Sequence, residues 1–117
     1  MIRMSASDRL PQCDQLNVEV DKVRAYLLNR EHAEGGSKAK FFINRGFAPD
    51  EPAVMIEALL THGQNQPVVE TNDTKFGKKF VVQCQIETPD GRNPCIVSVW
   101  IVEGEAPPRL VTARPNR

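Results

Sequence analysis

The stretch KKFVVQCQIETPDGRNPCIVSVWIVEG, residues 78–104, contains the strongest pattern in the sequence. Its first part alternates between two faces, which is typical of a strand with one covered side. The faces are Phe80, Val82, Cys84 and Ile86 on one side, and Val81, Gln83, Gln85 and Glu87 on the other. Residues 89–94, PDGRNP, form a turn by composition, with Asp90-Gly91 at its pivot. The second part is almost continuously apolar, as in a central strand, so the stretch predicts an antiparallel hairpin.

Two shorter segments extend this hairpin into a sheet. Residues 67–73, PVVETND, precede it, and residues 110–115, LVTARP, follow it. Simple alternation places Leu110, Thr112 and Arg114 on one face of the last strand. We therefore expect four strands in meander order.

The pattern before residue 65 is helical instead. Apolar residues recur there at spacings of three and four, which places an apolar stripe on each helix. Three helices are predicted, beginning near Asp21, Ser37 and Asp50, and the last two end at Gly46 and Gly63. His62, in the last turn, is predicted to face solvent as the helix ends.

Helices followed by a meander predict the fold class α+β, with N-terminal helices packed on one face of a four-stranded antiparallel sheet. Residues 16–115 would form a single domain, and residues 1–15 a flexible N-terminus. The open face of the sheet is then the place to look for function. It would carry Gln83, Gln85 and Glu87, with either Ser98 and Trp100 or their neighbours beside them.

Composition limits the kind of protein. The chain has 117 residues, of which 40% are hydrophobic and 26% charged, as in an ordinary globular domain. The formal net charge is zero, which argues against generic nucleic-acid binding. The charge is unevenly divided, however. Residues 1–73 hold 8 Lys+Arg and 11 Asp+Glu, whereas residues 74–117 hold 7 and 4.

Metal, cofactor and membrane signals are weak. The three cysteines, Cys13, Cys84 and Cys95, show no CxxC spacing, so neither a zinc site nor a disulfide framework is indicated. No stretch approaches the roughly 20 apolar residues that cross a bilayer. We expect a cytoplasmic protein without a metal, a cofactor or a membrane partner, and the oligomeric state stays open.

Several segments together suggest a family. Their order resembles a group of small uncharacterised bacterial domains that occur alone and at the C-termini of toxin-like and phage-related proteins. These segments are LLN, GGSKAKFFINRGF, KFGKKFVV, PDGR, VSVWIV and PRLVTARP, spanning roughly residues 16–115. The layout is also similar to the ribonuclease group of barnase, EndoU and RelE-type toxins, which is an analogy of fold.

That analogy implies candidate residues for cleaving RNA without metal, which needs a base, an acid and cations for the phosphate. The candidate catalytic residues are Lys38, Arg92, Thr112 and His32, and the candidate substrate-binding residues are Lys79, Arg114 and Trp100. Lys38 would lie at a helix start, where free amides favour an anion. Lys40 is about 200° away around the helix, so at most one of these lysines faces a site.

Each candidate also has a structural interpretation. Trp100 in a central strand is either a core residue or a side chain that stacks on a nucleobase. Arg114 is either a phosphate ligand or an exposed charge that keeps an edge strand in contact with water. Two functions therefore stay open. One is a ribonuclease-like toxin domain with RNA as its substrate. The other is a non-catalytic immunity, antitoxin or adaptor module that binds a cognate toxin or antitoxin through the sheet face or an edge strand.

Overall fold

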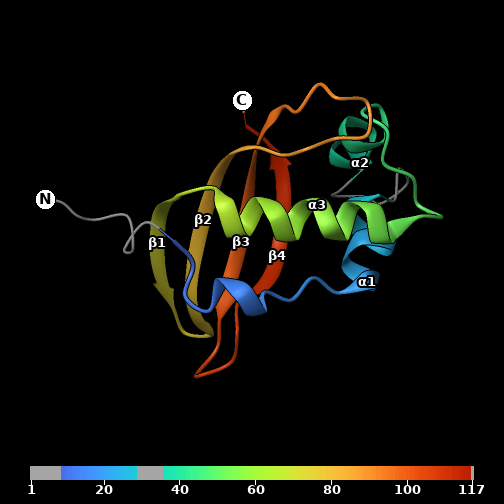
Figure 1. Cartoon of the computed structure of the whole chain (residues 1–117). Helices are drawn as coiled ribbons and strands as arrows, with labels where there is room; N and C mark the ends of the chain where they lie inside the picture. Colours follow the sequence, from blue (N-terminus) through green and yellow to red (C-terminus); the bar gives the residue numbers. More distant parts are fainter. Residues whose placement is uncertain (1–8, 29–35, 117) are drawn as a thin grey trace, which may run out of the picture.

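The computed structural model describes residues 9–28 and 36–116 (Figure 1). A short 3-10 helix, Cys13–Gln15, leads to α1, Val20–Lys22, which continues as a π-helical turn, Val23–Leu27. The remaining elements are α2 (Gly36–Ile43), α3 (Pro52–Asn65), β1 (Val68–Thr74), β2 (Gly77–Gln85), β3 (Cys95–Val102) and β4 (Arg109–Pro115). Among the described residues, no helix is long and apolar enough to cross a membrane.

The four strands form one antiparallel sheet in the order β1-β2-β3-β4, which confirms the predicted meander. The predicted hairpin is β2 with β3, where Phe80 pairs with Trp100 and Val82 with Ser98. β1 runs on to Thr74, beyond its predicted end at Asp73, because a tight turn joins it directly to β2 at Gly77.

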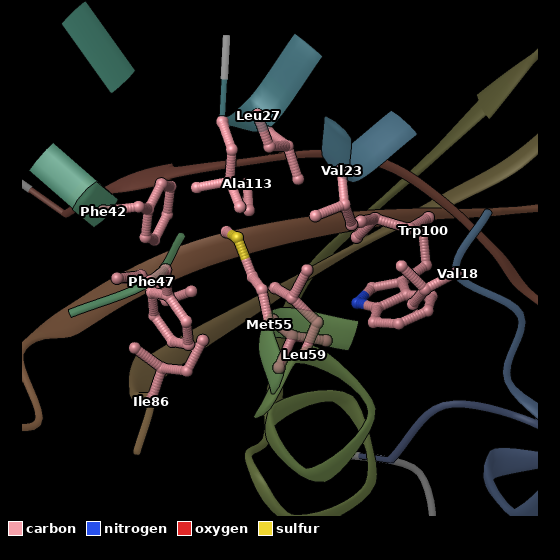
Figure 2. Packing of buried hydrophobic residues seen from close by; sticks show 14 of the residues in the cluster. Val18, Val23, Leu27, Phe42, Phe47, Met55, Leu59, Ile86, Trp100 and Ala113 are labelled. Atoms are coloured by element: carbon pink, nitrogen blue, oxygen red, sulfur yellow. The ribbon is translucent and has the colours of Figure 1, made fainter. Parts of the chain in front are cut away.

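The helices cover one face of this sheet, so the predicted α+β class is also confirmed. Figure 1 shows α3 lying across the strands. The core lies between α3 and the sheet, where Met55 and Leu59 pack toward Trp100 and Ala113 (Figure 2). All four of these side chains are fully buried. The opposite face of the sheet, which we call the open face, carries no helix in the part of the chain that the structure describes.

A β-bulge in β4 changes which residues reach the open face. Val99 pairs with Thr112, but its neighbour Trp100 pairs with Leu110, so Val111 is an extra residue. Leu110 is therefore buried on the helix-covered face, while Thr112 and Arg114 lie on the open face. The prediction that all three share one face is wrong, because simple alternation takes no account of a bulge.

The end of α2 is as the sequence predicts. Gly46 has a φ of 107°, its amide donates to the Ile43 carbonyl at 3.0 Å, and the Phe47 amide donates to Phe42 at 3.3 Å. This is the Schellman closure, and the rings of Phe42 and Phe47 lie 6.2 Å apart as its apolar contact. The start of α2 differs, because Ser37 lies inside a helix that already begins at Gly36.

The ends of α3 differ from prediction at both sides. The N-cap is Glu51 rather than Asp50, with Pro52 in the first turn. Gly63 does not end the helix, which continues to Asn65. A Cβ at Gly63 would lie 2.7 Å from Trp100 Cζ2 and 2.7 Å from Leu16 Cδ1. Glycine is therefore needed here for close packing, although the sequence alone suggests a helix stop.

The N-terminal segment packs onto the domain from residue 9 onward. Leu10 is buried in the core, and Arg9 Nη1 donates to the carbonyls of Gln64 and Asn65 at 3.0 Å each. Residues 9 and 10, which belong to the predicted flexible N-terminus, therefore contact the domain, and residues 1–8 lie outside the described part of the chain.

Candidate functional site

The open face is built from three rows of side chains that run across the strands. The pairing of β2, β3 and β4 places an apolar β3 residue at the centre of each row. The rows are Lys79–Ile101–Arg109, Val81–Val99–Thr112 and Gln83–Val97–Arg114. Val97 and Ile101 are buried although no described helix covers them, so the face has an apolar centre and a polar rim.

The rim is cationic although the protein as a whole is neutral. Lys79, Arg109 and Arg114 are the cationic strand residues of this face, whereas Glu70 on β1 is its carboxylate. Arg109 Nη2 is paired with Glu103 at 2.9 Å in the adjoining loop. The open face therefore carries an excess of positive charge, which its neutral composition does not reveal.

Two of the predicted catalytic residues meet at the edge of the sheet. Lys38 Nζ, on α2, donates to Thr112 Oγ1, on β4, at 3.4 Å. Both side chains are half-buried, and Arg114 lies two residues further along β4 on the same face. Two strand residues span about 7 Å, so one phosphate group can reach both Arg114 and the Lys38–Thr112 pair. We call these three residues the edge cluster.

Lys79 shares the open face but not the edge cluster. It lies two strands and one row, which is two residues along a strand, from Thr112. With about 4.8 Å between strands and about 3.4 Å per residue, their Cα atoms are about 12 Å apart. Lys79 is placed to contact a neighbouring phosphate of a chain-like ligand rather than the one at the edge cluster.

Arg92 makes its ion pair within its own loop. It lies in the loop between β2 and β3, where its Nε atom pairs with Asp90 Oδ2 at 2.8 Å. The Thr88 hydroxyl donates to Asp90 Oδ1 at 2.7 Å, and this bond, followed by the Arg92 amide, lowers the pKa of Asp90. Arg92 thus helps to brace its own loop, and its place in a catalytic cluster stays a prediction.

Trp100 lies on the helix-covered face, where it cannot stack on a nucleobase. Its side chain is fully buried on the helix-covered face, and its Nε1 atom donates to Ser98 Oγ at 2.8 Å. The structure corrects the prediction that it stacks on substrate, in favour of its core interpretation. Ser98 itself is fully buried beside it.

His62 completes this buried polar chain, so the prediction of a solvent-facing histidine is wrong. Its Nε2 atom lies 2.9 Å from the Cys84 carbonyl, which can only accept, so Nε2 carries the proton. Nδ1 then accepts from the Ser98 hydroxyl at 2.9 Å. Burial lowers the pKa of His62, with the Cys84 hydrogen bond acting in the opposite direction. With a neutral imidazole, every polar atom in this hydrogen-bonded series from Trp100 through Ser98 to His62 has a hydrogen-bond partner.

The predicted base His32 lies outside the described residues. Within the described ranges, no group of three or more histidine, cysteine or acidic side chains could hold a metal ion. The open face therefore offers cations, a hydroxyl group and apolar surface. Sequence reasoning does not place the positive charge on one face of the sheet. The signal that points to it is the excess of basic residues after residue 73.

Comparisons with known proteins agree with this fold. One chain of the contact-dependent growth inhibition toxin–immunity protein complex from Klebsiella pneumoniae 342 superimposes with a TM-score of 0.70 and 18% sequence identity. The match covers 90% of this chain and 97% of that chain. No curated protein sequence matches. Residues 9–117 match the family described as Domain of unknown function (DUF6883), and the chain therefore belongs to that family.

Proposed function

We propose that the protein is a toxin-type domain that binds RNA on the open face of its sheet and cleaves it without a metal ion. The observation that carries this proposal is the edge cluster, in which Lys38, Thr112 and Arg114 lie together on a cationic face. The shared fold with a chain from a toxin–immunity complex supports the toxin-related part of the proposal.

The chemistry follows from the groups present. In metal-independent cleavage the 2′-oxygen attacks the adjacent phosphorus, and the bond to the 5′-oxygen breaks. A base takes the 2′-proton and an acid supplies a proton to the 5′-oxygen. Arg114 would hold the phosphate, and Lys38, oriented by Thr112, would stabilise the added negative charge and protonate the leaving oxygen. His32 remains the predicted base.

The test is an RNA-cleavage assay with excess chelator. We expect purified wild type to degrade total RNA, and Lys38→Ala and Arg114→Ala each to lower the rate by about 100-fold, the usual loss when one group stabilising the transition state is removed. Lys75→Ala, which removes an equal charge from the exposed β1–β2 turn, is the matched control and should cleave normally. His32→Ala tests the predicted base separately. An inactive wild type would contradict the proposal.

A second function is favoured by the apolar centre of the same face. Val81 and Val99 lie side by side and half-exposed in the central row, where a protein partner could cover them, as an immunity or antitoxin module requires. Controlled expression in bacteria separates the two functions. A nuclease should arrest growth, and Lys38→Ala with Arg114→Ala should restore it, whereas a binding module should be harmless in either form.

A further inference from the structure

A groove lies on the other side of the molecule, away from the open face. It occupies about 340 Å³ between α3 and the loop that follows β2. Its apolar surface comes from Phe47, Ala58, Pro89 and Val54, and Val54 is 44% exposed. Glu87 lines this groove, so the prediction that it lies on the open face is wrong, because β2 ends at Gln85 and the chain turns toward α3.

Each wall of the groove carries one exposed carboxylate. Glu57 projects from α3 and Glu87 from the loop, and none of the described residues that line the groove is cationic. Thr61 and Thr88 are its other polar residues. The groove therefore combines an apolar floor with negative charge at both walls, and a neutral apolar group would leave that charge unmatched.

Hydrogen bonds fix the loop wall before anything binds. The Thr88 amide donates to Asn93 Oδ1 at 2.9 Å, and the Asn93 amide donates back to Thr88 Oγ1 at 3.1 Å. The Asp90 amide donates to the Arg45 carbonyl at 3.2 Å, which ties the loop to the end of α2. The opposite wall is a helix. A site with ordered walls loses little conformational entropy on binding.

We propose that this groove docks a protein segment that presents an arginine side chain next to an apolar residue. The aliphatic part of arginine and its flat guanidinium can lie on the apolar floor, while the charge meets Glu57 and Glu87. Arginine is also among the residues enriched at protein interfaces, together with methionine and the aromatic residues. The groove is open along the surface, as a side chain from a macromolecular partner requires. Because it uses no residue of the edge cluster, this proposal does not depend on RNA cleavage.

The test is an NMR titration of the ¹⁵N-labelled full chain with the peptide acetyl-Leu-Arg-amide. Acetyl-Leu-citrulline-amide, which has nearly the same shape without the charge, is the matched probe. We expect the arginine peptide to shift the amides of Ala58, Thr61 and Thr88 with a Kd of about 1 mM, and the citrulline peptide to bind about three- to tenfold more weakly. Equal binding of the two peptides, or shifts elsewhere only, would overturn the proposal.

Variants of the protein give the second arm. The double variant Glu57→Gln, Glu87→Gln should bind the arginine peptide about three- to tenfold more weakly than wild type does. Its affinity for the citrulline peptide should be unchanged. Glu105→Gln removes one carboxylate from the exposed β3–β4 loop, outside the groove, and should bind as wild type does. Unchanged affinity in the double variant would overturn the proposal, as would shifts of the groove amides on protein dilution, which would mean that a second copy occupies it. RNA cleavage should be normal in all these variants.

Discussion

At the scale of single residues, the buried chain from Trp100 through Ser98 to His62 determines how the core responds to pH. Ser98 accepts from Trp100 and donates to His62, so the hydroxyl links the sheet to α3. His62 must stay neutral, because its Nδ1 atom is the acceptor in this arrangement. Protonation would replace an accepted hydrogen bond with two facing donors in a buried site.

We predict that acid destabilises the fold through His62. Burial lowers the pKa of His62 in the folded state below its usual value of 6.5. Above that value neither state binds the proton. As the pH falls below it, the unfolded chain binds a proton that the folded one does not. The free energy of unfolding should then fall by up to about 1.4 kcal/mol per pH unit, until the pH reaches the lowered pKa.

Urea unfolding of wild type and His62→Gln, from about pH 8 down to about pH 5, measures this effect. All other titrating groups are common to both proteins, so the difference in stability between them should shrink as the pH falls. Parallel stability curves would show that His62 is not held neutral in the folded state.

At the scale of elements, the close approach of α3 to the sheet depends on Gly63. Replacing a helical glycine with alanine ordinarily stabilises a protein by about 1 kcal/mol. Here the new Cβ would lie 2.7 Å from both Trp100 and Leu16, and such overpacking typically destabilises by about 1–3 kcal/mol. We therefore predict that Gly63→Ala lowers the free energy of unfolding, which chemical denaturation followed by Trp100 fluorescence would measure.

Leu16→Ala provides the control for this prediction. In that background one of the two crowding atoms is absent, so Gly63→Ala should destabilise less than it does in wild type. If Gly63→Ala instead stabilises both proteins by the same amount, α3 does not lie so close to Trp100 that only glycine fits at this position.

The elements themselves could be predicted from the sequence, whereas contacts between them could not. Period-two alternation located β2, and Gly46 marked the end of α2, because both signals are local. Gly63 was misread because a glycine that stops a helix and one that admits a neighbouring ring look alike in sequence. The bulge at Val111 likewise arises from pairing with β3 and leaves no local signal.

At the scale of the whole molecule, only the fold reveals how a neutral chain divides its charge. Lys38 and Thr112 are 74 residues apart in sequence, and α2 brings them together at the edge of β4. Arg92 pairs with Asp90 in the loop between β2 and β3. Four of the predicted site residues thus share the open face or its edge, and these are Lys38, Lys79, Thr112 and Arg114.

This division of charge predicts how RNA binding depends on salt. A 2′-O-methyl oligonucleotide, which lacks the attacking hydroxyl, binds without being cleaved. Three contacts, from Lys38, Lys79 and Arg114, should make log K fall with log[KCl] with a slope of about −2, since each phosphate contact with a single strand contributes about −0.7. Fluorescence anisotropy over a range of KCl concentrations measures the slope.

Two variants decide whether the salt dependence of RNA binding comes from the open face or from the overall charge of the protein. Lys79→Ala should reduce the steepness of the slope by about 0.7, the share of one phosphate contact. Lys75→Ala removes the same charge from the β1–β2 turn and should leave the slope unchanged, because that turn lies at the end of the sheet. Equal effects of the two substitutions would mean that RNA responds only to net charge. Because the protein is neutral overall, binding that depends on Lys79 but not on Lys75 requires the RNA to lie along the open face.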